Sequence, residues 1–140
     1  MIKQRKRYAI DTGLVTALLE TDATAVLTHG DLLGRILETF VLAQLRPLLD
    51  VAERRVRAHH LRQQDGRREI DVLLEDANGH LVGLEIKASA GPSAADARHL
   101  SWLRNQLADR FTAGIVLHTG KAIYPLDRRI TAVPIAALWG

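Results

Sequence analysis

Segment 69–87 constrains the fold of this chain more than any other stretch. It contains two apolar runs separated by a polar turn around Asn78, a pattern that predicts a β-hairpin. Charged residues interrupt the apolar character: Asp71 starts the first run, and Glu85 and Lys87 end the second. Because successive side chains of a strand alternate between faces, Glu85 and Lys87 share one face. The turn then sets Asp71 opposite Glu85, to within one residue of register.

Two carboxylates and an amine on one patch of a sheet suit a divalent metal. Carboxylates held about 4–5 Å apart repel each other, and one takes up a proton unless a cation lies between them. Mg²⁺ prefers oxygen ligands, uses one or two carboxylates and keeps several waters, which leaves room for phosphate oxygens. Lys87 could position or polarise an attacking water. The alternative is a surface hairpin with a cross-strand ion pair worth less than about 1 kcal/mol, but the flanking apolar residues are typical of interior strands.

The basic residues favour contact with nucleic acid. The formal net charge is +3, the pI is near 9.7, and 15 of the 19 basic residues are arginine, whose planar fork matches phosphate geometry. Six arginines fall within 54–68, where Asp65 is the only acid. This cluster leads into the strand of Asp71, so it could draw a phosphate backbone toward the predicted metal. The alternative is an arginine-rich surface that only increases solubility.

Asp71, thirteen intervening residues and then Glu85-Ile86-Lys87 resemble the PD-(D/E)XK nuclease motif, with Ile70 where that family often has proline. Further segments occur in a familiar order, at 8–14, 37–41, 69–71, 85–89 and 134–139. Together they resemble the uncharacterised domain that follows an AAA-type ATPase module in many bacterial and archaeal proteins. The resemblance implies an α/β, restriction-endonuclease-like fold, in which a mixed central sheet is flanked by helices.

Glu38 is the fourth candidate for the site. It borders the apolar face of a predicted helix, where a carboxylate needs a partner or a metal. The resemblance implies that this acid completes the metal site with Asp71 and Glu85. The alternative is a boundary glutamate that reaches solvent or pairs with Arg35 or Arg46.

Other polar residues near the motif have weaker assignments. Glu69 lies on the same strand face as the first motif acid, where it supports the metal site or pairs with Arg67 or Arg68 at the surface. Arg62 and Gln64 are candidates to orient a phosphate. With Arg67 and Arg68, they form the predicted nucleic-acid-binding set.

The pattern of apolar residues predicts one domain over 1–140, with 1–30 as an N-terminal extension containing a short helix and 31–140 as the core. Helices are expected at 12–19, 31–49 and 92–109, a polar loop at 21–30, and strands at 56–62, over the two motif runs, and at 113–118, 122–126 and 130–133. Trp102 and Trp139 are expected to pack in the core. This order suits a sheet with helices on both sides.

Several classes of function are excluded or disfavoured. The chain has no cysteine, so it has neither disulfides nor a thiolate zinc site. No apolar run approaches the roughly 18–20 residues that a membrane span needs, and we expect a cytoplasmic protein. The glycine spacing in 114–121 does not fit a nucleotide-binding phosphate loop. The isolated histidines show no metal-ligand spacing and are interpreted as structural or surface residues, and the adjacent His59 and His60 do not readily share a metal.

The preferred interpretation is a metal-dependent nuclease that hydrolyses phosphodiester bonds with Mg²⁺ or Mn²⁺, with DNA as the expected substrate. Asp71, Glu85 and Glu38 would hold the metal, and Lys87 would help to position the water. One alternative is a catalytically inactive nuclease-fold module that regulates or binds a protein partner, in association with an AAA-type ATPase. Another is DNA binding without cleavage. The sequence does not distinguish DNA from RNA as the substrate, and it does not show whether the chain forms a homodimer.

Overall fold

The computed structural model describes residues 8, 9, 11–63 and 67–139. Three helices come first: α1 (Thr12–Leu18), α2 (Ala23–Thr28) and α3 (Gly30–Asp50). The remaining elements are β1 (Arg57–Arg62), β2 (Glu69–Glu75), β3 (Leu81–Lys87), α4 (Arg98–Leu107), η1 (Ala108–Arg110), β4 (Phe111–His118), β5 (Tyr124–Asp127), β6 (Ile130–Pro134) and η2 (Ile135–Trp139).

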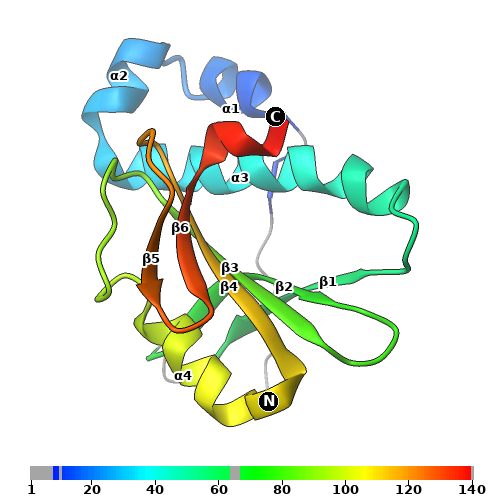
Figure 1. The fold of residues 1–140 in the computed structure, drawn as a ribbon. Helices are drawn as coiled ribbons and strands as arrows, with labels where there is room; N and C mark the ends of the chain where they lie inside the picture. The colour runs from blue at the N-terminus through cyan, green and yellow to red at the C-terminus, as the bar shows by residue number, and fades with distance from the viewer. Residues whose placement is uncertain (1–7, 10, 64–66, 140) are drawn as a thin grey trace.

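The strands form one mixed sheet in the order β1-β2-β3-β4-β6-β5. β1, β2 and β3 are an antiparallel meander, whereas β3, β4 and β6 run parallel and β5 pairs antiparallel with β6. Helix α4 provides the crossover that a parallel β3–β4 pair requires. Figure 1 shows α1, α2, α3 and η2 on one side of the sheet and α4 on the other. The predicted α/β class, with a mixed central sheet flanked by helices, is therefore confirmed.

Each face of the sheet has its own apolar core. On the α3 face, Val41 and Leu45 are packed in one cluster with strand residues Val72, Leu84, Ile86 and Leu117. On the α4 face, Leu100 and Leu103 are packed with Ile70, Leu73, Phe111, Val116 and Ile130. Burying each large side chain contributes roughly 1.5–3 kcal/mol. β2 and β3 supply residues to both clusters, so their register is strongly specified.

Helix α2 corrects the predicted polar loop over 21–30. The Asp22 side chain accepts a hydrogen bond of 2.8 Å from the Ala25 amide at the start of the helix, and Val26 is buried. An N-cap aspartate and one buried apolar side chain therefore outweigh the threonines that made this stretch look like a loop.

Helix α4 begins later than its sequence suggests. The prediction placed its start at 92–93, but the helix begins at Arg98. Ser93 and Asp96 do contact each other, since Asp96 Oδ2 accepts hydrogen bonds from Ser93 N at 2.8 Å and from Ser93 Oγ at 3.1 Å. These bonds close a turn before the helix, so a spacing typical of a helix cap serves a non-helical turn here.

The two tryptophans differ in burial. Trp102 packs against the α4-face core, as predicted. Trp139 packs against Phe40 with ring centroids 5.5 Å apart, but it is 52% exposed, so its expected place in the core is wrong. Within the described ranges, no helix has both the length and the apolar character that crossing a bilayer would require.

Gly120 allows two loops at one end of the sheet to touch. A Cβ at this position would lie 1.9 Å from the carbonyl oxygen of Ala90, whereas a Cβ at Gly91 would meet no described atom within 4 Å. The same contact is held by hydrogen bonds from Thr119 N to the Ser89 carbonyl at 3.2 Å and from Thr119 Oγ1 to the Ala88 carbonyl at 3.0 Å.

We therefore expect Gly120→Ala to lower the free energy of unfolding by about 2–3 kcal/mol, because the loops must separate to admit the methyl group. Gly91→Ala is the matched control and should change stability by less than about 0.5 kcal/mol. Urea denaturation followed by circular dichroism measures both. Equal stability of the two variants would contradict the packing described for this end of the sheet.

Candidate active site

The site lies where β2 and β3 separate. The last paired residues of the two strands are Val72 and Leu84. One step further, the Asp71 side chain takes the place of a strand partner, since its Oδ2 accepts a hydrogen bond of 2.9 Å from the Ile86 amide. The predicted opposition of Asp71 and Glu85 is confirmed.

A bulge in β2 turns Asp71 toward helix α3. The β1–β2 pairing runs from His59 with Leu73 to Leu61 with Ile70, so β2 contains one residue more than β1 in this interval. Such an extra residue bends the strand and changes the direction of a side chain. Ile70 and Leu73 therefore belong to the α4-face core, whereas Asp71 lines a cavity on the α3 side.

Glu85 is a buried acid with a raised pKa. It is 3% exposed, with Oε2 at 3.4 Å from Lys87 Nζ and Oε1 at 3.4 Å from His99 Nδ1. Oε1 is buried and accepts no hydrogen bond from the described part of the chain. Burial, and then the negative charge of Asp71, raise the pKa of Glu85 from its usual 4.5 to about 7, although Lys87 acts in the opposite direction. The neighbouring positive charges therefore do not fully offset the cost of ionising the buried Glu85.

Two histidines adjoin the acids. His99 of α4 donates from Nδ1 to the Glu69 carbonyl oxygen at 2.8 Å, which sets its ring beside Glu85. His60 of β1 donates from Nδ1 to the Asp71 carbonyl oxygen at 3.3 Å, and its Nε2 lies 3.5 Å from Glu69 Oε1. The sequence pattern predicts a structural or surface role for His99, and for His60 only that it does not readily share a metal with the adjacent His59. Their positions depend on how β1 and α4 pack on the motif strands, which no local pattern reveals.

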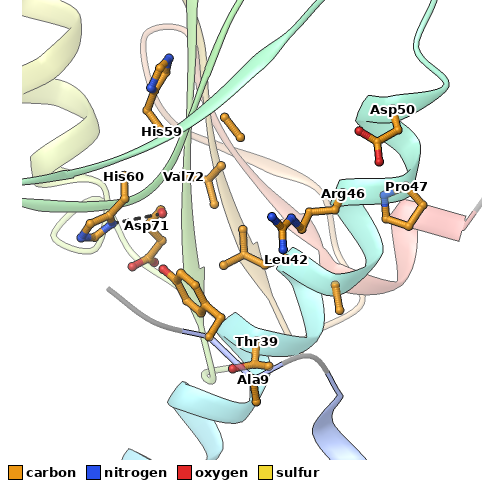
Figure 2. A pocket seen from close by; sticks show the side chains of 13 residues that line it. Ala9, Thr39, Leu42, Arg46, Pro47, Asp50, His59, His60, Asp71 and Val72 are labelled. Atoms are coloured by element: carbon orange, nitrogen blue, oxygen red, sulfur yellow. Dashed lines mark hydrogen bonds between the residues drawn. The ribbon is translucent and has the colours of Figure 1, made fainter. Parts of the chain in front are cut away.

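The cavity beside Asp71 has a volume of about 590 Å³. Figure 2 shows Asp71 and His60 at one side of it, and Thr39, Leu42 and Arg46 of α3 at the other. The acid of β2 is thus reachable from a space large enough for a ligand.

Glu38 lies on α3 and is half-buried; it takes part in an electrostatic or hydrogen-bonding interaction. Within the described residues, no group of three or more His, Cys, Asp or Glu side chains is placed to hold a metal ion. Glu38 therefore does not join Asp71 and Glu85 in a ready three-ligand cluster. Its role as a ligand stays a prediction.

The predicted nucleic-acid-binding residues have different surroundings. Arg62 is exposed, with its Nε 4.0 Å from Glu69 Oε2. Arg67 is exposed. The Arg68 guanidinium lies 4.4 Å from the centre of the Trp102 ring, where the ring face attracts a cation. Gln64 lies outside the described residues. The binding roles of all four stay predictions.

The perturbed Glu85 predicts how stability depends on pH without metal. Its pKa in the folded state, about 7, lies above the usual 4.5, so the folded chain binds this proton more tightly than the unfolded chain does. Protonation of Glu85 therefore adds to the free energy of unfolding below pH 4.5, and this contribution is lost as the pH rises through about 7. The loss is about 3–4 kcal/mol, because one pKa unit corresponds to about 1.4 kcal/mol.

Glu85→Gln should remove this dependence and become more stable than the wild type at alkaline pH. Thermal melting across the acid-to-alkaline range, in the presence of a chelator, measures the difference. Glu53→Gln removes an exposed carboxylate and should follow the wild-type profile. Parallel profiles for Glu85→Gln and wild type would contradict the buried, uncompensated carboxylate.

Comparisons with known proteins identify relatives without a known activity. The chain is 34% identical over 131 residues to the uncharacterized proteins Mb2031c of Mycobacterium bovis and Rv2008c of Mycobacterium tuberculosis. The match covers 92% of this chain but 27% of each relative, so the chain spans about a quarter of their length.

Among solved structures, the EndoMS-dsDNA2 complex matches 56% of this chain and 36% of its own chain, with 24% identity and a TM-score of 0.36. At that TM-score, the likeness supports no inference about substrate or reaction. The family comparison is stronger, because residues 33–138, well over half of the chain, match the model described as "Domain of unknown function (DUF4143)". The chain therefore belongs to the DUF4143 family.

Proposed function

We propose that this chain is a divalent-metal-dependent nuclease domain that hydrolyses phosphodiester bonds, with DNA as its substrate. The observation that carries the proposal is the pair Asp71 and Glu85 at the separation of β2 and β3. Glu85 is buried, has one oxygen without a hydrogen-bond donor in the described part of the chain, and is opposed by the charge of Asp71. Lys87 Nζ lies 3.4 Å from Glu85 Oε2, so the site also contains a positive charge that can attract a phosphate group.

The residues present fit a hard divalent cation. Asp71 and Glu85 would hold Mg²⁺ or Mn²⁺, with Glu38 as a further acid on the facing helix. Mg²⁺ uses one or two carboxylates and keeps several waters, so Asp71 and Glu85 would suffice; within the described residues no third His, Cys, Asp or Glu side chain is placed to complete a cluster. When bound, such an ion would neutralise phosphate charge. It would also lower the pKa of a bound water, so that this water can act as a nucleophile near neutral pH.

The chain's own residues would position the other reactants. Hydrolysis forms a bond between water oxygen and phosphorus and breaks one phosphorus–oxygen ester bond, while the proton lost by water balances the proton gained by the leaving oxygen. Lys87 is one-third exposed, so its ammonium can orient the water and oppose the charge that develops on phosphate oxygens. Asp71 is fixed by its bond to the Ile86 amide, which sets one side of the reacting geometry.

A second candidate function is a nuclease-fold module that regulates or binds a protein partner without catalysis. Two observations favour it. The chain spans 27% of the length of its mycobacterial relatives, and α1 and α2 carry exposed leucines, including Leu18 at 75% and Leu27 at 68%. Association with an AAA-type ATPase, a homodimer and a cytoplasmic location all stay predictions.

Metal binding should be measurable without any substrate. Near pH 8, Mn²⁺ or Mg²⁺ at about ten times its dissociation constant should stabilise the wild-type fold by about 1–2 kcal/mol. Asp71→Asn and Glu85→Gln should lose this effect, whereas Glu53→Gln should keep it. Differential scanning calorimetry with and without metal tests this. A metal-induced rise in melting temperature that survives in both site variants would contradict Asp71 and Glu85 as ligands.

Cleavage tests the proposed activity directly. The purified protein should be incubated with linear, branched and single-stranded DNA in Mg²⁺ or Mn²⁺. We expect cleavage, and a loss of at least about 100-fold in Lys87→Ala, because general acid–base and electrostatic groups contribute factors of about 10²–10⁴. Lys121→Ala removes an exposed lysine and should cleave at the wild-type rate.

The other outcomes separate the alternatives. Binding to DNA without cleavage supports a DNA-binding module, and neither binding nor cleavage supports the protein-binding module. Cleavage that is unchanged in Lys87→Ala contradicts the assigned site even if the chain is a nuclease.

A further inference from the structure

The cavity between α3 and the first two strands has a shape and lining of its own. Its volume of about 590 Å³ lies within the roughly 300–1,000 Å³ common for small-molecule sites. Helix α3 forms one wall, β1 and β2 form the other, and Tyr8 and Ala9 also line it. Figure 2 shows a space between helix and sheet, with Asp71 on its wall. Whatever occupies this cavity lies next to the proposed reaction.

The walls are suited to a flat, weakly polar group. Leu42 and Ala43 of α3 and Val72 of β2 all line the cavity, so it has apolar side chains on both its helix side and its sheet side. The rings of Tyr8 and His60 also contribute to the lining. A nucleobase presents two apolar faces and polar edges, and aromatic and apolar side chains bind such faces by stacking.

A cation reaches into the same cavity. Figure 2 shows Arg46 extending from α3 into the cavity. Arg46 is exposed, and neither an ion pair nor a hydrogen bond within the described ranges engages its guanidinium. Asp50, on the following helical turn, also lines the cavity, so the positive charge of Arg46 is opposed at the rim. An arginine beside apolar walls is suited to a phosphate group, which it can bind through two parallel hydrogen bonds.

We propose that this cavity holds one unstacked nucleotide of single-stranded DNA, adjacent to the phosphodiester at Asp71 and Glu85. The inference rests on the proposed function, because Asp71 belongs both to the reaction site and to the cavity wall. The base lies between α3 and Val72, and Arg46 binds the next phosphate of the strand. The site thereby prefers DNA in which a nucleotide is already unpaired.

The selection follows from the cost of freeing a base. A nucleotide inside a duplex must lose its pairing and stacking before it enters such a cavity, whereas a single strand or a frayed end has already lost most of both. Single-stranded DNA should therefore bind more tightly than a blunt duplex of the same sequence.

Binding of a fluorescein-labelled oligodeoxythymidylate, measured by fluorescence anisotropy, tests the proposal apart from cleavage. The assay uses the full chain carrying Lys87→Ala, so that the strand stays intact. Two further changes alter the cavity: Ala43→Phe fills it, and Arg46→Ala removes its cation. Matched changes on the same helix outside the cavity are Leu48→Phe and Arg35→Ala. Melting temperatures confirm that every variant is folded.

We expect Ala43→Phe and Arg46→Ala each to weaken binding by about tenfold, which is the size of one lost stacking or phosphate contact. Leu48→Phe and Arg35→Ala should stay within about twofold. The blunt duplex should bind more weakly than the single strand. Duplex binding as tight as single-strand binding, or unchanged affinity in both cavity variants, overturns the proposal. Tighter binding of oligouridylate overturns its assignment to DNA.

Failure of this proposal can be told apart from failure of the proposed function. A chain that cleaves DNA but shows the same affinity after Ala43→Phe is a nuclease without this subsite. A chain that never cleaves, yet binds single strands through Ala43 and Arg46, retains the subsite without the reaction.

Discussion

The hydrogen bond from the Ile86 amide to Asp71 Oδ2, 2.9 Å long, determines the arrangement of everything around it. It is formed where the ladder between β2 and β3 has ended, so a side chain satisfies a buried amide that a neighbouring strand would otherwise satisfy. The bond fixes Asp71 between the separating strands and brings its charge to Glu85. Asp71 thereby lies between the cavity, whose wall it helps to form, and Glu85, whose pKa its charge raises.

The electrostatics around Glu85 show how the fold keeps a charged group in an unfavourable state. Burial and a neighbouring carboxylate both disfavour its ionised form, and Lys87 and Arg98 only partly offset them. The surrounding apolar clusters, with Phe111, Val116 and Leu100 fully or almost fully buried, supply the stability that allows this. Strongly perturbed acids occur more often at functional sites than elsewhere, although structural ion pairs also perturb them.

The sequence predicted those parts of the fold that depend on local patterns. Asp71 meets Glu85 because a short turn sets the register of one hairpin, and alternation sets the face of Lys87. The long helix α3 and the late strands follow from the same kind of periodicity. The start of α4 was misplaced because Ser93 and Asp96 have the spacing of a helix cap but close a turn, and α2 was missed because one aspartate cap outweighs its threonines.

Other features depend on contacts that no local pattern encodes. The bulge at Asp71 arises in the pairing with β1, and it turns the side chain toward α3. His99 approaches Glu85 because α4 packs on β2, β3 and β4, and the Glu69 carbonyl that it binds lies thirty residues earlier in the chain. Glu38 lies on α3, as its predicted role as a metal ligand requires, but the structure forms no three-ligand cluster within the described residues.

The antiparallel meander also has a consequence for the order in which the chain folds. Asp71 and Glu85 belong to neighbouring strands joined by a tight turn, so little loop entropy is lost when they meet. The parallel pairing of β3 with β4 must wait for the α4 crossover, and the contact between Thr119 and Ala88 spans 31 residues. Contacts of long sequence separation slow the search for the native state. We expect the two acids to come together early, with the parallel half of the sheet closing over an already formed pair.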